Sequence, residues 1–246
     1  MNKYLIAFLI GIIAIGTLHG QDIIYCENAN PPFSYDRDNR ACGIYPEIIR
    51  EIYSQLHQDV TLIPVPWQRA LSTVKNTQTG IGGLVKNSQR EQYLDYTIPM
   101  YSEVFVIYYR MGKQKITSLD DLRGLTIGTI RGWSYGDVFD DAAKQNIFVI
   151  QDNISEKLNI EKLRYGRIDA VIAIEESSDL IIQELGLTDM IEKSEYSFNL
   201  DIYMAFNKKC NKQNDIQRIN EIINKLQSDG LIMQIKKREI KAIPKT

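Results

Sequence analysis

The chain has 246 residues, of which 44% are hydrophobic and 24% are charged. This composition supports one large packed domain or two small ones and excludes an intrinsically disordered chain. The formal net charge is −2 and the sequence has no basic stripe, so we expect neither nucleic acid nor an anionic membrane surface as a partner. The charge favours a small molecule or another protein.

The first twenty residues have the pattern of a signal peptide. Lys3 supplies a positive charge, residues 5–18 are largely apolar, and the polar pair Gln21-Asp22 follows. The apolar run is shorter than the ~20 residues that a membrane-spanning helix needs. We therefore expect residues 1–20 to be cleaved on export and the mature chain to act in the periplasm.

Strand and helix patterns alternate in the first half of the chain. Residues 22–26 and 81–85 predict strands, and residues 46–56 predict a helix with one apolar face. A shorter helical stripe at 70–74 precedes the second of these strands, and residues 101–109 predict another strand. This alternation is typical of an α/β fold.

The second half repeats this order. Ser118-Leu119-Asp120-Asp121 resembles a helix cap, and we expect Ser155 to cap a helix that runs to Gly166. The remaining predicted elements are strands at 125–130, 168–174 and 203–206, a helix at 180–185 and a terminal helix at 216–226. Because no linker rich in proline, glycine or serine separates the two units, extended strands are expected to connect them.

Three cysteines, Cys26, Cys42 and Cys210, are too few for a disulfide scaffold and lack the close pairing of a zinc site. We expect no metal and no cofactor. A bridge between Cys26 and Cys42 would be worth ~3 kcal/mol in the chain-entropy model. Three unpaired thiols are the alternative, and the sequence does not decide between them.

Six short segments carry a resemblance. They are Asn30–Tyr35, Gly43–Glu47, Pro66–Leu71, Ser88–Arg90, Arg131–Gly136 and Gly166–Val171. In this order they resemble the periplasmic solute-binding proteins of the polar amino-acid type, family 3. The resemblance covers essentially all of the mature chain, and its strength lies in the order of the segments rather than in any one of them.

The resemblance implies a two-lobed α/β fold, a type II-like clamshell with two hinge strands. The first lobe is expected to comprise residues 22–109 and 203–246, and the second residues 110–202. The crossings are expected near 108–111 and 201–205. A monomer that closes on a small anionic ligand and delivers it to an ABC permease or a membrane receptor is the implied function.

Arg90 falls where members of that family place the arginine that grips the ligand carboxylate. A guanidinium fork matches both carboxylate oxygens and stays charged at any working pH. The alternative is a surface arginine paired with Glu91 or Asp95.

The segment Gly132-Trp133-Ser134-Tyr135 follows a predicted buried strand and opens a helix. Backbone N–H groups and the positive end of a helix dipole would then face the ligand, with the Ser134 hydroxyl as a further donor. The alternative is a plain turn, in which Ser134 only caps the helix.

Aromatic residues at strand ends are further candidates. Trp67 and Tyr35 are predicted to line the cleft and stack on the ligand, with Phe33 a weaker candidate and Arg69 a possible second cation. Each aromatic has core packing as its alternative, and Arg69 has a solvated helix face.

Two departures from the family pattern bear on the ligand. Ile174 stands where amino-acid binders usually carry the aspartate that holds the α-ammonium, and Gly82, Gly83 and Val85 replace small hydroxyl residues. Glu175 is a candidate replacement for the aspartate, or else a solvated residue at a helix start. The sequence therefore weakens the case for an ordinary α-amino acid as the ligand.

An enzyme is the rival class. Some proteins that resemble this family are periplasmic cyclohexadienyl dehydratases. A cleft glutamate such as Glu175 would serve as a general acid in such an enzyme if burial raised the pKa of its carboxyl group. The mature chain has one histidine, His57, and no nucleophile motif or phosphate loop. We therefore expect a binding protein with no catalytic residues.

Overall fold

The computed structural model describes residues 21–113 and 115–242. The predicted signal peptide at residues 1–20 lies outside this range. Within the described residues, no helix has both the length and the apolar character needed to cross a membrane.

The described part of the chain alternates strands and helices. The strands are β1 (Asp22–Glu27), β2 (Ala29–Asn30), β3 (Ser34–Arg37), β4 (Arg40–Cys42), β5 (Val60–Val65), β6 (Gly80–Val85), β7 (Leu94–Tyr96), β8 (Tyr101–Arg110), β9 (Thr126–Ile130), β10 (Val149–Asn153), β11 (Ala170–Ile174) and β12 (Ile191–Asn207). The α-helices are α1 (Ile44–Leu56), α2 (Trp67–Asn76), α3 (Asp137–Lys144), α4 (Glu156–Arg164), α5 (Glu175–Glu184), α6 (Gln213–Ser228) and α7 (Leu231–Lys241). Three 3₁₀ turns are η1 (Arg90–Gln92), η2 (Leu119–Leu122) and η3 (Lys208–Cys210).

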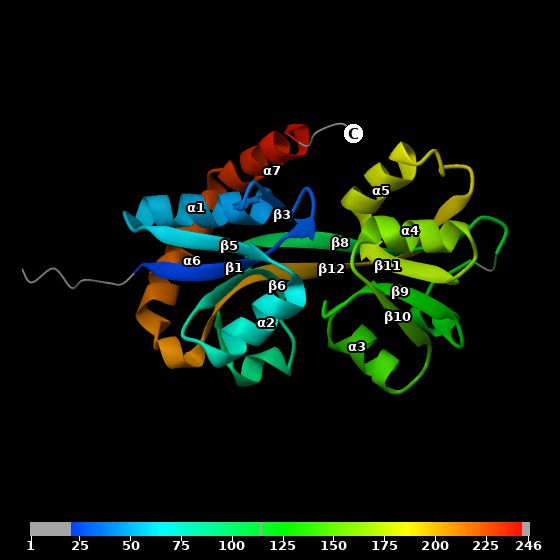
Figure 1. Ribbon diagram of the computed structural model, residues 1–246, viewed down its shortest axis with the longest axis horizontal. Helices are drawn as coiled ribbons and strands as arrows, with labels where there is room; N and C mark the ends of the chain where they lie inside the picture. Colours follow the sequence, from blue (N-terminus) through cyan, green and yellow to red (C-terminus); the bar gives the residue numbers. More distant parts are fainter. Residues whose placement is uncertain (1–20, 114, 243–246) are drawn as a thin grey trace, which may run out of the picture.

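The molecule has two lobes, which lie side by side in Figure 1. One sheet path joins them in the order β10-β9-β11-β8-β12-β6-β1-β5, with β7 paired to β12. In the first lobe β5, β1 and β6 are parallel, and in the second β10, β9 and β11 are parallel. The predicted two-lobed α/β fold is therefore confirmed.

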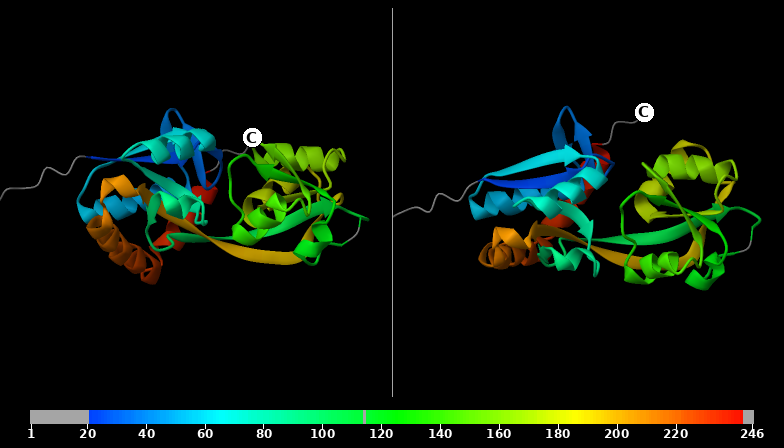
Figure 2. Two further views of the ribbon diagram at one scale, coloured as in Figure 1. Left: turned by 90° about the horizontal axis from the view of Figure 1, so that it is seen from below. Right: turned by 60° about the horizontal axis from the view of Figure 1, so that its bottom comes forward.

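The strands β8 and β12 connect the lobes. They run antiparallel and side by side from one lobe to the other (Figure 2). Residues 105–109 of β8 pair with β11 of the second lobe, whereas residues 202–206 of β12 pair with β6 of the first. β8 therefore adds an antiparallel strand to the second lobe and β12 adds one to the first, so a single sheet path runs through both lobes.

Apolar helix faces hold each lobe together. The stripe Ile48, Ile49, Ile52 and Leu56 of α1 is buried, and α1 packs against α6 and α7 while α2 covers β1 and β6. In the second lobe Ser155 caps α4 as predicted, because its side chain accepts a hydrogen bond from the backbone N–H of Leu158. Burial of the apolar helix faces against the sheet and against other helices is the main favourable contribution to the free energy of folding.

Several elements differ from the predictions. The predicted terminal helix is α6, but a further helix, α7, follows it after Gly230. The short strand predicted at 203–206 is the end of a strand of 17 residues, β12. The helix predicted at 180–185 begins at Glu175, directly after β11 ends at Ile174. All three cysteines are free, so the alternative with unpaired thiols holds in this structure.

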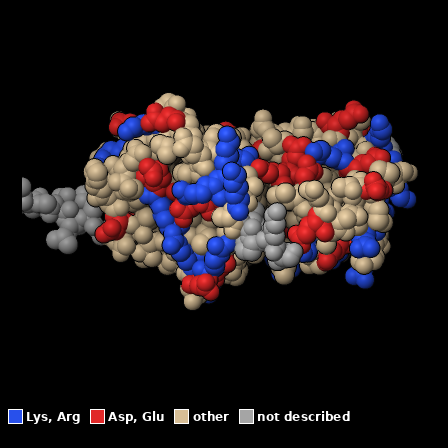
Figure 3. Space-filling model, turned by 90° about the horizontal axis from the view of Figure 1, so that it is seen from above, with Lys and Arg blue, Asp and Glu red and all other residues tan. Residues whose placement is uncertain are grey.

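Charged side chains of both signs share the surface of the first lobe. Figure 3 shows Lys and Arg side chains gathered there with acidic side chains among them. Glu47 lies 3.6 Å from Arg40 and 3.3 Å from Arg238, and it also pairs with Arg50. The basic groups in this region are thus partly neutralised by a shared carboxylate.

One carboxylate is buried at the crossing between the lobes. Glu103 lies on β8, is 3% exposed, and accepts a hydrogen bond of 2.7 Å from the Tyr45 hydroxyl. Burial raises the pKa of Glu103 to about 8, and this rise is opposed by the hydrogen bond from Tyr45 and by the charge of Lys236. Lys236 itself spans the lobes, since its Nζ lies 2.6 Å from Glu176 on α5.

We predict that Glu103 makes stability depend on pH. Because its pKa is raised from 4.5 to about 8, the folded protein keeps a proton that the unfolded chain releases between these values, so stability falls as pH rises through this window. The Glu103→Gln variant keeps an acceptor for Tyr45 and should be more stable than the wild type at pH 8–9 by about 1–3 kcal/mol. Urea unfolding across pH 4.5–9 measures this, with exposed Glu221→Gln as control. Parallel pH profiles for wild type and Glu103→Gln would contradict the prediction.

Candidate functional site

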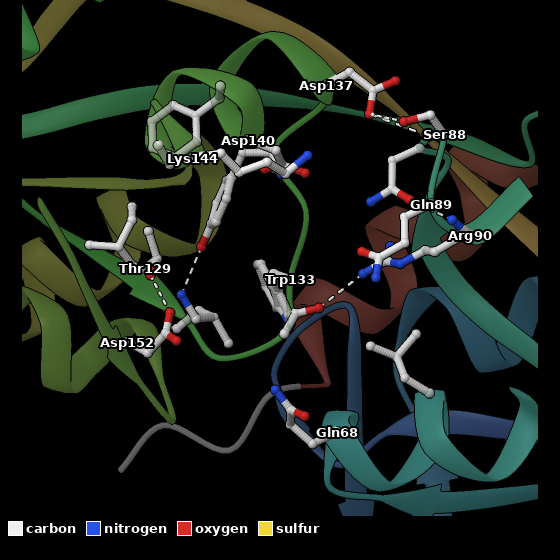
Figure 4. Close-up of a pocket in the computed structure, with 18 of the residues that line it drawn as sticks. Gln68, Ser88, Gln89, Arg90, Thr129, Trp133, Asp137, Asp140, Lys144 and Asp152 are labelled. Atoms are coloured by element: carbon white, nitrogen blue, oxygen red, sulfur yellow. Dashed lines mark hydrogen bonds between the residues drawn. The ribbon is translucent and has the colours of Figure 1, made fainter. Parts of the chain in front are cut away.

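Arg90 lies in the cleft between the lobes. It begins η1, just after β6, and its side chain points toward the loop that follows β9 in the second lobe (Figure 4). The backbone N–H of Arg90 donates to the Asn87 side chain at 2.9 Å, which fixes the turn. Residues 87–90 therefore form a tight turn.

The Arg90 guanidinium is buried and its charge has no acidic partner. The residue is 5% exposed, and burial lowers its pKa. Its Nη1 donates to the backbone oxygen of Val85 at 2.7 Å and its Nη2 to that of Gly132 at 2.9 Å. Among the described residues, no carboxylate lies within ion-pair distance of it, so the predicted alternative of a surface pair with Glu91 or Asp95 does not hold.

The backbone oxygen of Gly132 is the point where the lobes meet. It also accepts the Trp67 indole N–H at 3.0 Å, and the Arg90 guanidinium lies 5.8 Å from the centre of the Trp67 ring. Gly132 has φ +80, and a Cβ built there would lie 2.7 Å from Nε2 of Gln68. A larger residue at 132 is therefore strained by its backbone conformation, and the end of the Gln68 side chain would have to move.

The loop after Gly132 is held mainly by its own hydrogen bonds. Ser134 Oγ donates to Asp140 at 2.5 Å, and the backbone N–H of Tyr135 donates to the same carboxylate at 3.0 Å. The Tyr135 hydroxyl accepts a hydrogen bond from the N–H of Ile130. The single proton of the Ser134 hydroxyl is thus engaged within the loop, which leaves its oxygen only as an acceptor.

An inner cavity of about 30 Å³ lies beside Arg90. Its wall is mostly aromatic and aliphatic, and it comes from both lobes. The lining residues are Asn30, Tyr45, Trp67, Gly83, Val85, Arg90, Phe105, Trp133, Ser134, Ile174 and Ile202. The structure thus brings together the predicted residues Arg90, Trp67, Trp133 and Ser134 with Ile174.

Two predicted site residues lie elsewhere. Tyr35 is on β3, where its hydroxyl accepts a hydrogen bond from Arg37, and it does not line the inner cavity. Glu175 forms an ion pair of 2.7 Å with Lys193 and borders a separate cavity with Glu103 and Lys236. Neither faces Arg90. Of the weaker candidates, Phe33 is in the core and Arg69 is exposed.

Packing explains the glycines that stand in place of hydroxyl residues. A Cβ at Gly82 would lie 2.4 Å from the Ile49 side chain, and a Cβ at Gly83 would lie 2.5 Å from the Tyr45 ring. A larger side chain at either of these two positions would therefore force the Ile49 or Tyr45 side chain to move, and at Gly83 the φ of +80 adds backbone strain. Both Tyr45 and Gly83 line the inner cavity beside Arg90.

Glu27 is a cleft residue that the sequence did not single out. It ends β1 and is buried, which raises the pKa of its carboxyl, while hydrogen bonds from the Asn28 backbone and the Trp133 side chain oppose the rise. Trp133 belongs to the second lobe, so this contact also crosses the cleft. The position of Glu27 at the carboxyl end of a parallel strand is the sequence feature that could have indicated a cleft residue.

No cluster of three or more His, Cys, Asp or Glu side chains that suits a metal ion exists among the residues that the structure describes. The lining of the inner cavity includes the Arg90 guanidinium, two indoles and apolar side chains. A guanidinium among aromatic side chains is chemically suited to the anionic group of a small molecule.

Solved structures share this fold at low sequence identity. The arginine-, lysine-, histidine-binding protein ArtJ from Geobacillus stearothermophilus has a TM-score of 0.72 and 18% identity, with 92% of this chain and 97% of that chain covered. A substrate-binding protein of an amino acid ABC transporter from Streptococcus pneumoniae, bound to L-arginine, has a TM-score of 0.72 and 19% identity, with 92% of this chain and 97% of that chain covered. A histidine kinase sensor domain with similarity to periplasmic binding proteins has a TM-score of 0.75 and 19% identity, with 90% of this chain and 96% of that chain covered.

Among curated protein sequences, none matches this chain. A family model matches residues 23–242, which is nearly the whole of the described chain. The segment order, the two lobes joined by β8 and β12, and this match agree. The chain belongs to the bacterial extracellular solute-binding proteins, family 3.

Proposed function

We propose that the protein is exported and captures a small anionic solute between its lobes, with Arg90 as the anion-binding group. The buried Arg90 guanidinium, which faces the cleft without an acidic partner, carries this proposal. A buried charge is costly unless polar groups compensate it. Backbone oxygens supply only partial negative charge, and a ligand carboxylate would supply the full charge.

The ligand is held by groups of both lobes. Arg90 and Trp67 belong to the first lobe, and Gly132 and Trp133 to the second. A ligand carboxylate that takes the guanidinium from the Gly132 oxygen replaces this direct contact between the lobes with charge-assisted hydrogen bonds to the ligand. The crossings of β8 and β12 between the lobes are then the hinge, and we place the β8 crossing before residue 105, where pairing with β11 begins.

Binding without catalysis is the function that this site favours. Glu175, the candidate general acid, is paired with Lys193 and lies away from Arg90. We propose that the loaded protein delivers its ligand to an ABC transporter or to a membrane receptor. The structures that share this fold include a substrate-binding protein of an amino acid ABC transporter and a histidine kinase sensor domain.

We predict that Arg90→Ala weakens binding of the cognate ligand by ~2–5 kcal/mol, because the ligand carboxylate loses its charge-assisted partner in a desolvated cleft. Arg90→Lys should also bind poorly, since an ammonium cannot reproduce the fork. Isothermal titration calorimetry measures both, and thermal melting checks that each variant folds. Exposed Arg69→Ala is the control. Unchanged affinity in a folded Arg90→Ala would remove Arg90 from the site.

Ligand binding is predicted to reduce the radius of gyration. Two lobes joined by paired strands close by a hinge when a ligand bridges them, and Trp67 and Trp133 lie on opposite sides of the cleft. Small-angle scattering and tryptophan fluorescence should therefore change together on saturation. Identical scattering with and without a tightly bound ligand would argue against hinge closure.

A third prediction concerns the α-ammonium of free amino acids. Ile174 lines the inner cavity and offers no acceptor on its side chain, so an α-ammonium placed there would be buried without a partner, which is costly. Deaminated analogues should bind within about threefold of the corresponding L-amino acids in calorimetry. Micromolar binding of an L-amino acid that is lost in its deaminated analogue would show that another residue holds the ammonium.

A further inference from the structure

A groove lies on the outer side of Arg90, between α2 of the first lobe and α3 of the second (Figure 4). Its volume is about 560 Å³, against about 30 Å³ for the inner cavity. Arg90 and Trp133 line both spaces. The groove and the inner cavity are therefore neighbouring compartments that share the same cationic group.

One face of each helix is turned toward this groove. On α2 the lining residues Gln68, Leu71, Ser72 and Lys75 follow the spacing of a single helical stripe. On α3 the corresponding residues are Asp137, Asp140 and Lys144. Ser88 donates to Asp137 from its backbone N–H and its hydroxyl, at 3.3 and 3.2 Å, and so joins the two walls at the rim.

The two walls differ in charge. The first lobe contributes the cations Lys75 and Arg90, and Lys75 lies over the Tyr93 ring at 5.6 Å. The second lobe contributes Asp140, which accepts from Ser134 and Tyr135, and Asp152, which accepts from the Thr129 hydroxyl at 2.7 Å. It also contributes Asp137 and one cation, Lys144, which pairs with Asp141 at 2.8 Å. Among the described residues, Lys75, Arg90, Asp140 and Asp152 form no ion pair. The charged groups of the first-lobe wall are thus cations, whereas acidic groups outnumber the single lysine on the second-lobe wall.

Size separates the two compartments as binding sites. A volume of about 30 Å³ holds about two water molecules, whereas small-molecule sites usually measure ~300–1,000 Å³. The groove is within that range and is lined mostly by polar side chains. With the lobes as they stand, only the groove has room for the body of a ligand whose anionic group contacts Arg90.

We propose that this groove is a second ligand subsite, which holds the body of an extended zwitterion longer than a free amino acid, such as a short peptide. The ligand carboxylate contacts Arg90 and Lys75, and its ammonium and N–H groups face Asp140 and Asp152. In a peptide the ammonium is at least one residue away from the carboxylate, so it avoids the apolar surface at Ile174. This inference rests on the proposed role of Arg90.

The test is calorimetry with two sets of probes, the common L-amino acids and di- and tripeptides of alanine and serine with free termini. At least one peptide should bind ten times more tightly than its constituent amino acids, and N-acetylation should weaken it. Ser72→Trp, which fills the groove, should weaken peptide binding at least tenfold. Asp152→Asn should weaken it several-fold, because it removes one charge of the acidic wall.

Matched controls lie outside the groove. Ser228→Trp is an exposed helical serine on α6, and Asp189→Asn is an exposed aspartate of the second lobe, so both should leave peptide binding unchanged. Thermal melting shows whether each variant folds. If Ser72→Trp fails to fold, Ala143→Phe on the opposite wall replaces it.

The outcomes separate this inference from the proposed function. If free amino acids bind as tightly as peptides and Ser72→Trp has no effect, while Arg90→Ala abolishes binding, the groove is not a subsite but the function stands. If neither probe set binds the wild type, the inference is overturned for zwitterions of this length. If a probe binds equally well to the wild type and to folded Arg90→Ala, both proposals are wrong.

Discussion

The contacts of the cleft centre on one buried positive charge, that of Arg90, whose guanidinium donates to backbone oxygens of both lobes. The Arg90 guanidinium is held away from water, and oxygens of Val85 and Gly132 surround it. Since Gly132 belongs to the second lobe, the environment of this charge depends on how the lobes meet. Trp67 donates to the same oxygen, so one backbone carbonyl ties Arg90 and the Trp67 indole to the second lobe. Any ligand that competes for Arg90 therefore also acts on the contact between the lobes.

Arg90 stands at the boundary between two compartments of different character. The inner cavity is small and most of its lining residues are aromatic or aliphatic, whereas the outer groove is large and most of its lining residues are polar. A ligand with many hydrogen-bonding groups therefore finds more partners in the groove than in the inner cavity. Lys236 and Glu176 form another bridge between the lobes, and both line a separate cavity with the buried Glu103. Polar contacts between the lobes thus occur at Arg90 and also at Lys236.

Local patterns predicted the helix α1 and the strand β6 for different reasons. The apolar stripe of α1 was found because burial of one face imposes a period on the sequence, whereas β6 was found as a short apolar run. The strand β12 was largely missed, since charged residues such as Glu192, Lys193 and Glu195 interrupt its pattern. Helix α7 was missed because Gly230 resembled the end of the chain's last helix, whereas it is the left-handed residue that connects α6 to α7. Tertiary packing decided both cases.

The sequence by itself determined the class of fold, the family resemblance and the candidacy of Arg90, Trp67 and the loop at Gly132, because these follow from short motifs in a fixed order. Only the tertiary structure decided that Glu175 pairs with Lys193 and faces away from Arg90. It also decided that the Gly132 oxygen, 42 residues from Arg90 and 65 from Trp67, completes the environment of both. The reason is physical: a periodic pattern reports which face of an element is buried, whereas contacts across the cleft depend on how the two lobes are placed relative to each other.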